Sequence, residues 1–596
     1  MQSFVVNVIS FLFAIILCEH LARSERRCRC LSHDKSCWPH SSVWQAFNES
    51  INGQLVSVQP SAAPCNSNPL NVEACTTARQ QWRNAVWRSD QPGAMQNHNW
   101  ENSSCSVFYN STSCHQGSVP ILAVNAILPE HVEATIRFVD KYNLRLVVKA
   151  TGHDFFGRST AVGSLLLWLH HMKNRTLIPK WSSCRGETFE NVIRVDAGVQ
   201  WGEVYRWLAA YNLIAIGGAS ATVGATGGFL QGGGHSPLSP WKGLAADQVL
   251  QFEVVLADGR RQIVNFCENP DLFWALRGGG GGTFAVVLSA ILRTYPTPSI
   301  VGSYQAVFPP TNNRYADFLH HFVRSLPALA DMGWAGYFYL TAKTFTLAFL
   351  SPNGNYSTAY QSMHQLFRNF SDLNFTEPYV FELPTFLDFF SALMEATNEN
   401  GDNYVMGSRL LPEAIIRHQP QQVADAFLRI IDSEQGFLVG HLTAGGKVSD
   451  ITQNNSVNPL WRTALLHMLS AQFWPDETPI EDQVKLAKRV TQNVEILQTV
   501  SGGEQSGAYL NEADPNEVDW QQKFFGTREH YTRLKTIKDR VDPNGLFVCN
   551  KCVGSDDWTE DLNCPNPKQS IANKHKLFLP LVLIAKFLLS YFKIDV

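Results

Sequence analysis

A single histidine, His153, lies in a turn that is rich in glycine and small polar residues. The stretch from Lys149 to Ser159 reads KATGHDFFGRS and follows an apolar run, Leu144 to Val148, that predicts a buried strand. Gly152 and Gly157 allow the backbone to turn sharply and to approach a ligand closely. Free backbone N–H groups in such a turn favour a bound anion. The segment therefore predicts a site for a phosphate-bearing ligand, and the plainer alternative is a turn in which His153 only satisfies backbone groups.

Two further glycine-rich segments indicate that this ligand is large. They are Gly217 to Gly234, GGASATVGATGGFLQGGG, and Gly278 to Gly282, which follows Arg277. Glycine costs backbone entropy on folding, so three separated clusters favour repeated close approach to one extended ligand, and FAD fits this description. The run GGGTFA satisfies a relaxed dinucleotide pattern, but the apolar Val286 to Ile291 behind it predicts a strand where that fold needs a helix. No GxxxxGK[ST] phosphate loop occurs in the sequence.

These segments resemble the FAD-linked oxidases of the vanillyl-alcohol oxidase type, in the branch of berberine bridge enzyme and the fungal oligosaccharide and isoamyl alcohol oxidases. The family's (R/K)xxGHxxxGxS turn matches at Lys149, Gly152, His153, Gly157 and Ser159. Its CxTVGxxGGxxxGGG segment matches at Thr222, Val223, Gly224, Gly227, Gly228, Gly232, Gly233 and Gly234. Further matches are Asp247 to Gly259, Arg277 with the strand to Val287, Tyr509 to Asp514, Trp520 and Asp542 to Phe547. The resemblance covers about residues 116–560.

The resemblance implies FAD as the cofactor, bound covalently from His153 to the 8α-methyl group of the flavin. A neutral imidazole nitrogen is a competent nucleophile near neutral pH. Many members form a second bond from a cysteine, but Ser220 stands at that position here, and a hydroxyl cannot replace a thiolate in that role. We therefore expect a covalent link through His153 only. The implied cofactor-binding residues are His153, Lys149, Gly152, Gly157, Ser159, Ser220, Thr222, Val223, Gly224, Gly227, Gly228, Gly232, Gly233, Val286 and Asn511.

The implied catalytic residues are Tyr509, from the C-terminal YxN motif, and Gln472, on a predicted strand. Tyr509 would accept the proton of the substrate hydroxyl while hydride passes from carbon to flavin N5, and Gln472 would orient the substrate. A phenol with an ordinary pKa near ~10 is a poor base at neutral pH, so a cationic or hydrogen-bonding partner is expected. His441, Lys447 and Arg462 lie in the flanking sequence. The plainer alternatives are a core tyrosine and a polar residue of an alternating strand.

Composition and cysteine usage favour a large secreted globular protein. The 596 residues exceed one usual domain, and the net charge of −4 with no basic run argues against a nucleic-acid partner. The apolar run from Phe4 to Cys18 predicts a cleaved signal peptide, although no lysine or arginine precedes it. Without Cys18 the cysteines are even in number, and seven of them crowd between Cys28 and Cys114, which predicts a disulfide-tied extension. Sequons at Asn48, Asn102, Asn110, Asn174, Asn355, Asn369, Asn374 and Asn454 fit the secretory route.

Two other segments bear on metal and membrane binding. Cys549 and Cys552 form a CxxC, but no second pair follows at zinc-ribbon spacing, so no metal site is predicted. The run from Leu577 to Phe592 is apolar but contains Pro580 and Lys586, and it is short for a membrane span of about 20 residues. A removed GPI-attachment signal is one interpretation. An amphipathic or incidental tail is favoured, so membrane attachment is not expected.

The fold class implied is α+β, with a two-subdomain PCMH-type FAD-binding fold and a second α+β substrate domain whose antiparallel sheet covers the flavin. The expected segments are a signal peptide (1–23), a Cys-rich N-terminal extension (24–115), the FAD-binding domain (116–297), the substrate domain (298–500), a berberine-bridge-type segment that returns to the FAD domain (501–560) and an apolar tail (561–596). A helix is expected to begin at Pro129. Trp334 to Leu350 alternates as strands do, and Gln419 to Ser433 reads as an amphipathic helix.

These features predict a secreted FAD-dependent oxidase that takes hydride from an alcohol-bearing carbon and passes electrons to O2, giving a carbonyl product and H2O2. In similar families the position of Val223 lies beside the flavin, where a small side chain leaves room for O2; otherwise Val223 is a buried aliphatic. The substrate would be a small-molecule alcohol, a sugar or a secondary metabolite, and Trp334, Tyr337, Phe338 and Tyr339 suit sugar stacking or a flat ligand. The alternatives are oxidative C–H or C–N chemistry on a secondary metabolite and a non-catalytic secreted flavin-binding glycoprotein.

Overall fold

The computed structural model describes residues 26–567, except residues 68, 109–113, 308–312, 374–378, 396–398 and 434. The predicted signal peptide, the apolar run of the tail and the sequons at Asn110 and Asn374 lie outside the described residues. Among the residues it does describe, no helix combines the length and the apolar character that a membrane crossing requires.

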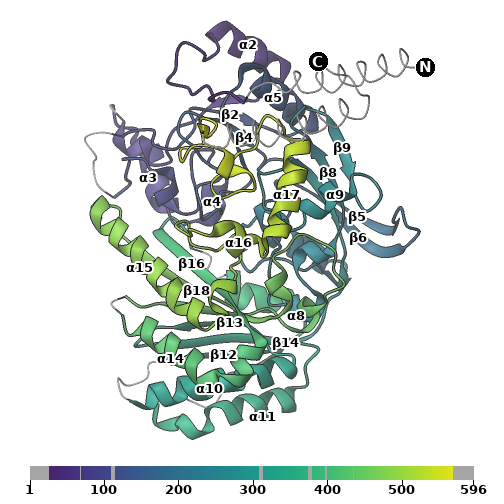
Figure 1. The fold of residues 1–596 in the computed structure, drawn as a ribbon, viewed down its shortest axis with the longest axis vertical. Helices are drawn as coiled ribbons and strands as arrows, with labels where there is room; N and C mark the ends of the chain where they lie inside the picture. The colour runs from purple at the N-terminus through teal and green to yellow at the C-terminus, as the bar shows by residue number, and fades with distance from the viewer. Residues whose placement is uncertain are drawn as a thin grey trace, which may run out of the picture.

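The half of the molecule in the upper part of Figure 1 contains the glycine-rich segments, a small sheet and a larger one. We call it the cofactor-binding half, after the cofactor that the sequence predicts for these segments. The small sheet has the order β1-β2-β4-β3, with β1 Leu55–Ser57, β2 Leu122–Asn125, β4 Leu165–Trp168 and β3 Leu146–Lys149. Its last three strands run parallel, and helix α5, Pro129–Tyr142, connects β2 to β3. The helix begins at Pro129 as predicted, since a proline in the first turn has no N–H whose bond could be lost.

The larger sheet of this half is antiparallel and carries the third glycine-rich segment at one end of a strand. Its order is β5-β6-β10-β8-β9, with β5 Arg175–Ser182, β6 Thr188–Asp196, β10 Val286–Leu292, β8 Val249–Val255 and β9 Arg261–Val264. All seven residues of β10 are buried. A strand therefore follows the GGGTFA run, which confirms that this run is not the start of a dinucleotide-binding helix.

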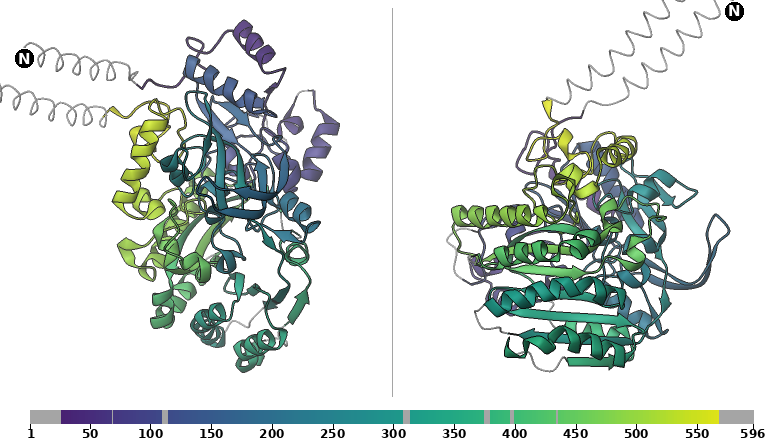
Figure 2. Two further views of the ribbon diagram at one scale, coloured as in Figure 1. Left: turned by 90° about the vertical axis from the view of Figure 1, so that its right-hand side faces the viewer. Right: turned by 60° about the horizontal axis from the view of Figure 1, so that its bottom comes forward.

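A seven-stranded antiparallel sheet forms the second half, in the lower part of Figure 1. Its order is β15-β12-β14-β13-β17-β18-β16, with β12 Ile300–Val307, β13 Ala335–Leu340, β14 Phe345–Pro352, β15 Tyr379–Leu383, β16 Asn403–Pro412, β17 Leu438–Leu442 and β18 Ala464–Trp474. The helices are α10 Asn313–Asp331, α11 Tyr356–Phe367, α14 Pro420–Ile431 and α15 Ile480–Thr499. Figure 2 shows them stacked on the strands. The strands expected in 334–350 and the helix expected near 420–431 are confirmed.

Side-chain alternation divides the two faces of this sheet between core and cavity. Phe338 of β13 and Leu347 of β14 pack with α10 and α14 in one apolar cluster. Tyr337 and Tyr339, one position away on β13, instead line a cavity that faces the cofactor-binding half. Of the four aromatic residues proposed for substrate stacking, Tyr337 and Tyr339 therefore reach this cavity, whereas Trp334 and Phe338 belong to the core.

Disulfides and the returning C-terminal segment fasten the cofactor-binding half. All cysteines after Cys18 are paired: Cys28–Cys564, Cys30–Cys37, Cys65–Cys75, Cys105–Cys114, Cys184–Cys267 and Cys549–Cys552. The first of these joins the N-terminal extension to the C-terminal segment, whose helices are α16 Trp520–Phe525 and α17 Arg528–Val541. Figure 1 shows the yellow C-terminal segment beside the purple N-terminal one. The CxxC is thus a disulfide rather than a half of a zinc site.

The N-terminal extension also braces the turn that carries His153. Arg88 and Glu101 form an ion pair of 2.8 Å in which both side chains are fully buried. Arg88 donates two further bonds to the Met95 carbonyl, which fixes the loop between them. From that loop, Gln96 donates its backbone N–H to the Gly152 carbonyl at 2.9 Å. The ion pair therefore holds the loop on which the His153 turn rests.

We predict that Glu101→Gln lowers the free energy of unfolding by about 3–5 kcal/mol, because it leaves the buried Arg88 guanidinium without its counter-charge. Denaturant titration of the purified protein measures the change. The matched control is Lys485→Gln, which breaks the exposed pair Lys485–Asp482 and should change stability by less than about 1 kcal/mol. Equal effects of the two substitutions would contradict this account of the extension.

Candidate active site

A cavity of about 760 Å³ lies between the cofactor-binding half and the seven-stranded sheet. Eleven of the residues expected at the site line it: Gly152, His153, Ser159, Ser220, Val223, Gly224, Gly227, Gly228, Val286, Tyr509 and Asn511. Two glycine-rich segments meet in its wall, where a Cβ built on Gly281 would come within 2.8 Å of the Gly228 Cα. Backbone is thus exposed to a ligand along several segments, as FAD requires. The residues present fit this cofactor.

His153 is held in one orientation at the cavity wall. Gly152 before it adopts a φ of +81°, which a residue with a side chain would rarely adopt. The His153 Nε2 lies 2.7 Å from the Thr222 Oγ1, so the first and second glycine-rich segments are joined at this ring. Burial lowers the pKa of His153 to about 3. The imidazole is therefore neutral at ordinary pH, as a nucleophile must be.

Five of the residues expected to bind the cofactor do not line the cavity: Lys149, Gly157, Thr222, Gly232 and Gly233. The Lys149 ammonium points into the N-terminal extension, where it donates to the carbonyls of Gln91, Pro92 and Ala94 at 3.1, 2.5 and 2.9 Å. Its contacts make it a brace of the His153 turn rather than a ligand of the cofactor. Gly232 instead allows close packing, since a Cβ at this position would lie 2.4 Å from the Asn511 side chain.

Tyr509 is buried at the cavity wall, and its hydroxyl oxygen accepts two hydrogen bonds. The Asn511 Nδ2 donates to it at 2.7 Å and the Gly234 N–H at 3.2 Å. Burial and the nearby Glu512 carboxylate nevertheless raise the pKa of Tyr509 above its ordinary value. The cationic partner expected from the sequence is not supplied by the three candidates. Arg462 binds Asp247, Lys447 is exposed, and His441 faces another histidine.

Gln472 lies on the face of β18 that is turned away from the cavity. It does not line the cavity, and its Nε2 donates to the Gln435 carbonyl at 3.0 Å. Side chains alternate along a strand, so Gln472 and Ser470 share the face that packs on α15, where Asn493 bonds to Ser470. His467, an odd number of residues away, points to the opposite face. The role proposed for Gln472 therefore has no support in this geometry.

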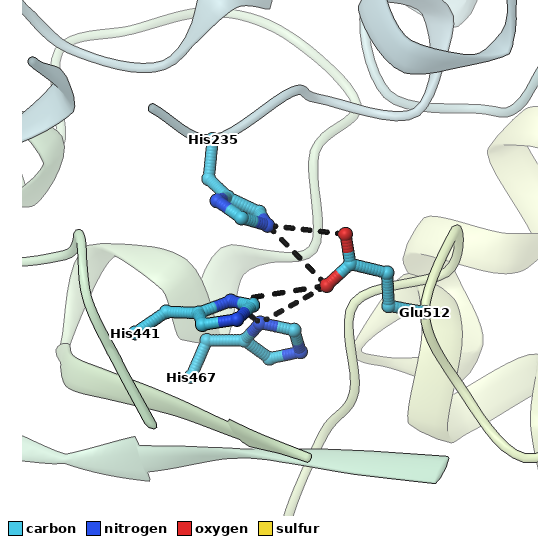
Figure 3. A group of neighbouring side chains, drawn as sticks. All are labelled: His235, His441, His467 and Glu512. Carbon is cyan, nitrogen blue, oxygen red and sulfur yellow. Dashed lines mark hydrogen bonds and ion pairs between the residues drawn. The ribbon is translucent and has the colours of Figure 1, made fainter. Parts of the chain in front are cut away.

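Three histidines and Glu512 form a cluster at the cavity, shown in Figure 3. His441 of β17 is paired directly with His467 of β18, and their Nδ1 atoms lie 3.0 Å apart. The Glu512 carboxylate lies 3.3 Å from the His235 Nε2, 3.5 Å from the His467 Nδ1 and 3.9 Å from the His441 Nδ1. We call these four residues the histidine–glutamate cluster. His235, His441 and Glu512 also line the cavity.

The charges within the cluster follow from burial and proximity. Burial lowers the pKa of both His441 and His467 well below the ordinary histidine value, so both rings are neutral near pH 7. Burial opposes ionisation of Glu512, but His235 and His441 outweigh it and hold the pKa of this carboxyl below its ordinary value. The cluster thus presents an ionised carboxylate among imidazole rings.

Sequence reasoning did not assemble this cluster, because its members come from four segments. His235 follows the second glycine-rich segment, and Glu512 stands inside the matched YxN run. From the sequence His441 is expected only as a partner for Tyr509, and His467 lies in an apolar stretch with no motif around it. The signal that could have found them is the pairing of β17 with β18, which places two histidines side by side, and this register is not readable from one sequence.

Comparison with known proteins places this geometry in a family. A model of the FAD binding domain matches residues 120–265, and a model described as berberine and berberine like matches residues 508–554. An uncharacterized FAD-linked oxidoreductase of Arthroderma benhamiae is 35% identical, covering 94% of this chain and 99% of that protein. The FAD-linked oxidoreductase patO of Penicillium expansum is 34% identical, covering 89% and 93%. The VAO-type flavoprotein MtVAO713 from Myceliophthora thermophila C1 has a similar structure, with a TM-score of 0.84 and 29% identity, covering 91% of this chain and 100% of that one.

The chain belongs to the FAD-linked oxidoreductases of the VAO type that carry a berberine-bridge-like C-terminal segment. It is an oxidoreductase, and FAD is its cofactor. The fold class expected from the sequence is confirmed by the same likeness.

Proposed function

We propose that the protein is a secreted oxidase that takes hydride from an alcohol-bearing carbon, passes the electrons to O2, and gives a carbonyl product and H2O2. The observation that carries this proposal is that one cavity is lined by the glycine-rich segments, by His153, and by the side chains of Tyr509 and Glu512. FAD, when bound, supplies the hydride acceptor. The six disulfides support an oxidising, extracellular location.

His153 is the residue we propose for the covalent link to the flavin. We propose the tautomer in which the His153 Nε2–H donates to the Thr222 hydroxyl, and in this tautomer the neutral ring carries its lone pair on Nδ1. Nδ1 is then the nucleophilic atom that would form the bond to the 8α carbon as a C–H bond of that methyl group breaks. The flavin ring would take up the electron pair, and O2 would reoxidise it to give H2O2. Ser220 lines the cavity where related proteins carry a cysteine, so we propose that the link through His153 is single.

Tyr509 and Glu512 are the residues we propose for handling the substrate hydroxyl. Because Asn511 and Gly234 both donate to the Tyr509 oxygen, the phenol proton remains available to a substrate oxygen in the cavity. The raised pKa of Tyr509 keeps this proton in place at neutral pH. Glu512 is ionised and accepts only, so it receives the hydroxyl proton as hydride leaves carbon. This division of roles replaces the assignment of Tyr509 as the base.

The opposite wall of the cavity suits a ring-bearing alcohol or sugar. Tyr304, Tyr337, Tyr339 and Tyr404 line it from three strands of the seven-stranded sheet. Tyrosine rings offer flat apolar faces with a polar tip, which fits substrates that combine a ring with hydroxyl groups. The proposed class is therefore a cyclic alcohol, a sugar or a hydroxylated secondary metabolite.

We predict that Glu512→Gln lowers the rate of flavin reduction by roughly 10²–10⁴-fold, since the proton acceptor is lost. Tyr509→Phe should lower it by roughly 10²-fold, since one hydrogen-bond donor is lost. Substrates are first found by H2O2 release on a panel of aliphatic alcohols, cyclic alcohols and sugars, and the rates are then measured by anaerobic stopped-flow spectroscopy. Glu504→Gln, an exposed glutamate of the same segment, is the control and should leave the rate unchanged. Unaltered reduction in Glu512→Gln would contradict the proposed proton acceptor, and a panel that yields neither H2O2 nor flavin reduction would contradict the proposed alcohol oxidase.

Val223 is the position at which we propose that O2 reaches the flavin. Its half-buried side chain lines the cavity in the second glycine-rich segment. We predict that Val223→Leu slows reoxidation of the reduced flavin by O2, because the added methylene group fills the space beside it. Anaerobic reduction should be unaffected. Mixing the reduced protein with oxygenated buffer measures the first rate, and reoxidation as fast as in the wild type would exclude a role for Val223 in O2 access.

A further inference from the structure

The histidine–glutamate cluster has the composition of a site for a divalent transition metal. Its four donor atoms, one from each residue, all lie within 4.8 Å of one another. Imidazole nitrogen and carboxylate oxygen are the donors that Zn²⁺ takes, along with thiolate, and three protein histidines with one carboxylate complete a fourfold set. The cluster lies outside the sequence motifs that the family likeness explains, apart from the position of Glu512 in the YxN run.

The separations between the donor atoms agree with a tetrahedral site. Zn–N and Zn–O distances of about 2.0–2.1 Å place tetrahedral donors about 3.3 Å from one another. Four of the six separations are 3.0 Å between His441 and His467, 3.3 Å between His235 and Glu512, 3.5 Å between His467 and Glu512, and 3.9 Å between His441 and Glu512. The other two, from His235 to His441 and to His467, are no more than 4.8 Å. Binding of a cation therefore requires the four donor atoms to move closer together, without a rearrangement of the strands that carry them.

The charge balance of the cluster also calls for a cation. Among the described residues, Glu512 forms ion pairs with the three histidines and with no lysine or arginine. Aromatic rings pack around the cluster: the Trp461 ring centre lies 6.0 Å from that of His235, and the Tyr509 ring centre lies 5.7 Å from that of His467. A carboxyl group in such surroundings suits a cation, because buried carboxylates in proteins are paired with a positive charge or coordinate a metal.

The backbone holds the donors in place before any cation arrives. His441 and His467 are directly opposite each other on two hydrogen-bonded strands, so their spacing is fixed by the sheet. His235 follows Gly234, whose N–H is bonded to the Tyr509 hydroxyl. Glu512 lies in a turn closed by a 2.9 Å bond from its N–H to the Tyr509 carbonyl. A preorganised set of this kind binds without paying for the ordering of its ligands.

We infer that His235, His441, His467 and one carboxylate oxygen of Glu512 bind one divalent transition-metal cation, Zn²⁺ in the first instance, in the wall of the substrate cavity. The second oxygen of Glu512 is left for the proton transfer proposed above. Three of the four ligands line the cavity, so the bound cation faces the space that a substrate enters. There it would take the oxygen of an alcohol or hydroxy compound as an additional ligand. This last step rests on the proposed function, whereas binding of the cation does not.

The test is Zn²⁺ binding to the full-length holoprotein after chelation and dialysis. Isothermal titration with Zn²⁺ should show one site per flavin in the wild type, and at least a 100-fold weaker affinity in both His467→Ala and Glu512→Gln. Covalent flavin absorbance must be retained in each variant, which shows that the fold is intact. Elemental analysis by mass spectrometry of the titrated and desalted samples gives the stoichiometry independently.

The chain offers a matched control in a second group, Asp90, His170 and His171, which lies away from the cavity. His171→Ala should leave the tight site unchanged. Loss of the tight site in His171→Ala alone, or wild-type uptake no greater than that of His467→Ala, would overturn the inference. Zn²⁺ binding without turnover of any alcohol would leave this site standing and defeat the proposed function, whereas alcohol turnover without Zn²⁺ binding would do the reverse.

Discussion

The contact between the His153 ring and the Thr222 hydroxyl is the interaction around which the cofactor site is arranged. It joins two glycine-rich segments that are about 70 residues apart in the sequence, and it holds the His153 ring through its Nε2. Two contacts with the N-terminal extension hold the turn that presents His153. Gln96 of the extension donates to the Gly152 carbonyl, and Lys149 of the turn donates to carbonyls of the extension. The Cys-rich extension thus supports the turn that carries His153, although none of its described residues lines the cavity.

The second half of the site depends on side-chain alternation in the seven-stranded sheet. One face of this sheet forms an apolar core with its helices, so the other face is free to carry polar residues. Tyr337, Tyr339 and His441 occupy that free face and meet Tyr509 and Glu512, which the C-terminal segment brings back from far along the chain. Residues of both halves line the cavity, so the cavity exists only where the two halves meet.

Much of this organisation could be predicted from the sequence, for identifiable physical reasons. Glycine runs mark close approach to a large ligand, and an apolar run behind GGGTFA marks a strand, whereas the fold class and the identity of the cofactor came from the resemblance of these motifs to a known family. The side on which Gln472 lies could not be predicted, because one register position on β18 separates the cavity face from the helix face. Lys149 fits the family motif, but its side chain bonds to the N-terminal extension instead of facing the cavity. The residues around His467 form no motif that would mark it as part of a site. Contacts between distant strands and loops decide these cases, and one sequence does not contain them.

The central claim is that this cavity holds FAD through a bond to His153. The most direct test is to precipitate the purified protein with acid and to measure flavin absorbance in the pellet, in the wild type and in His153→Ala, with His171→Ala as a control outside the cavity. We expect yellow pellets for the wild type and His171→Ala and a colourless pellet for His153→Ala. Flavin that stays with the His153→Ala pellet, or a wild-type pellet without flavin, would contradict it.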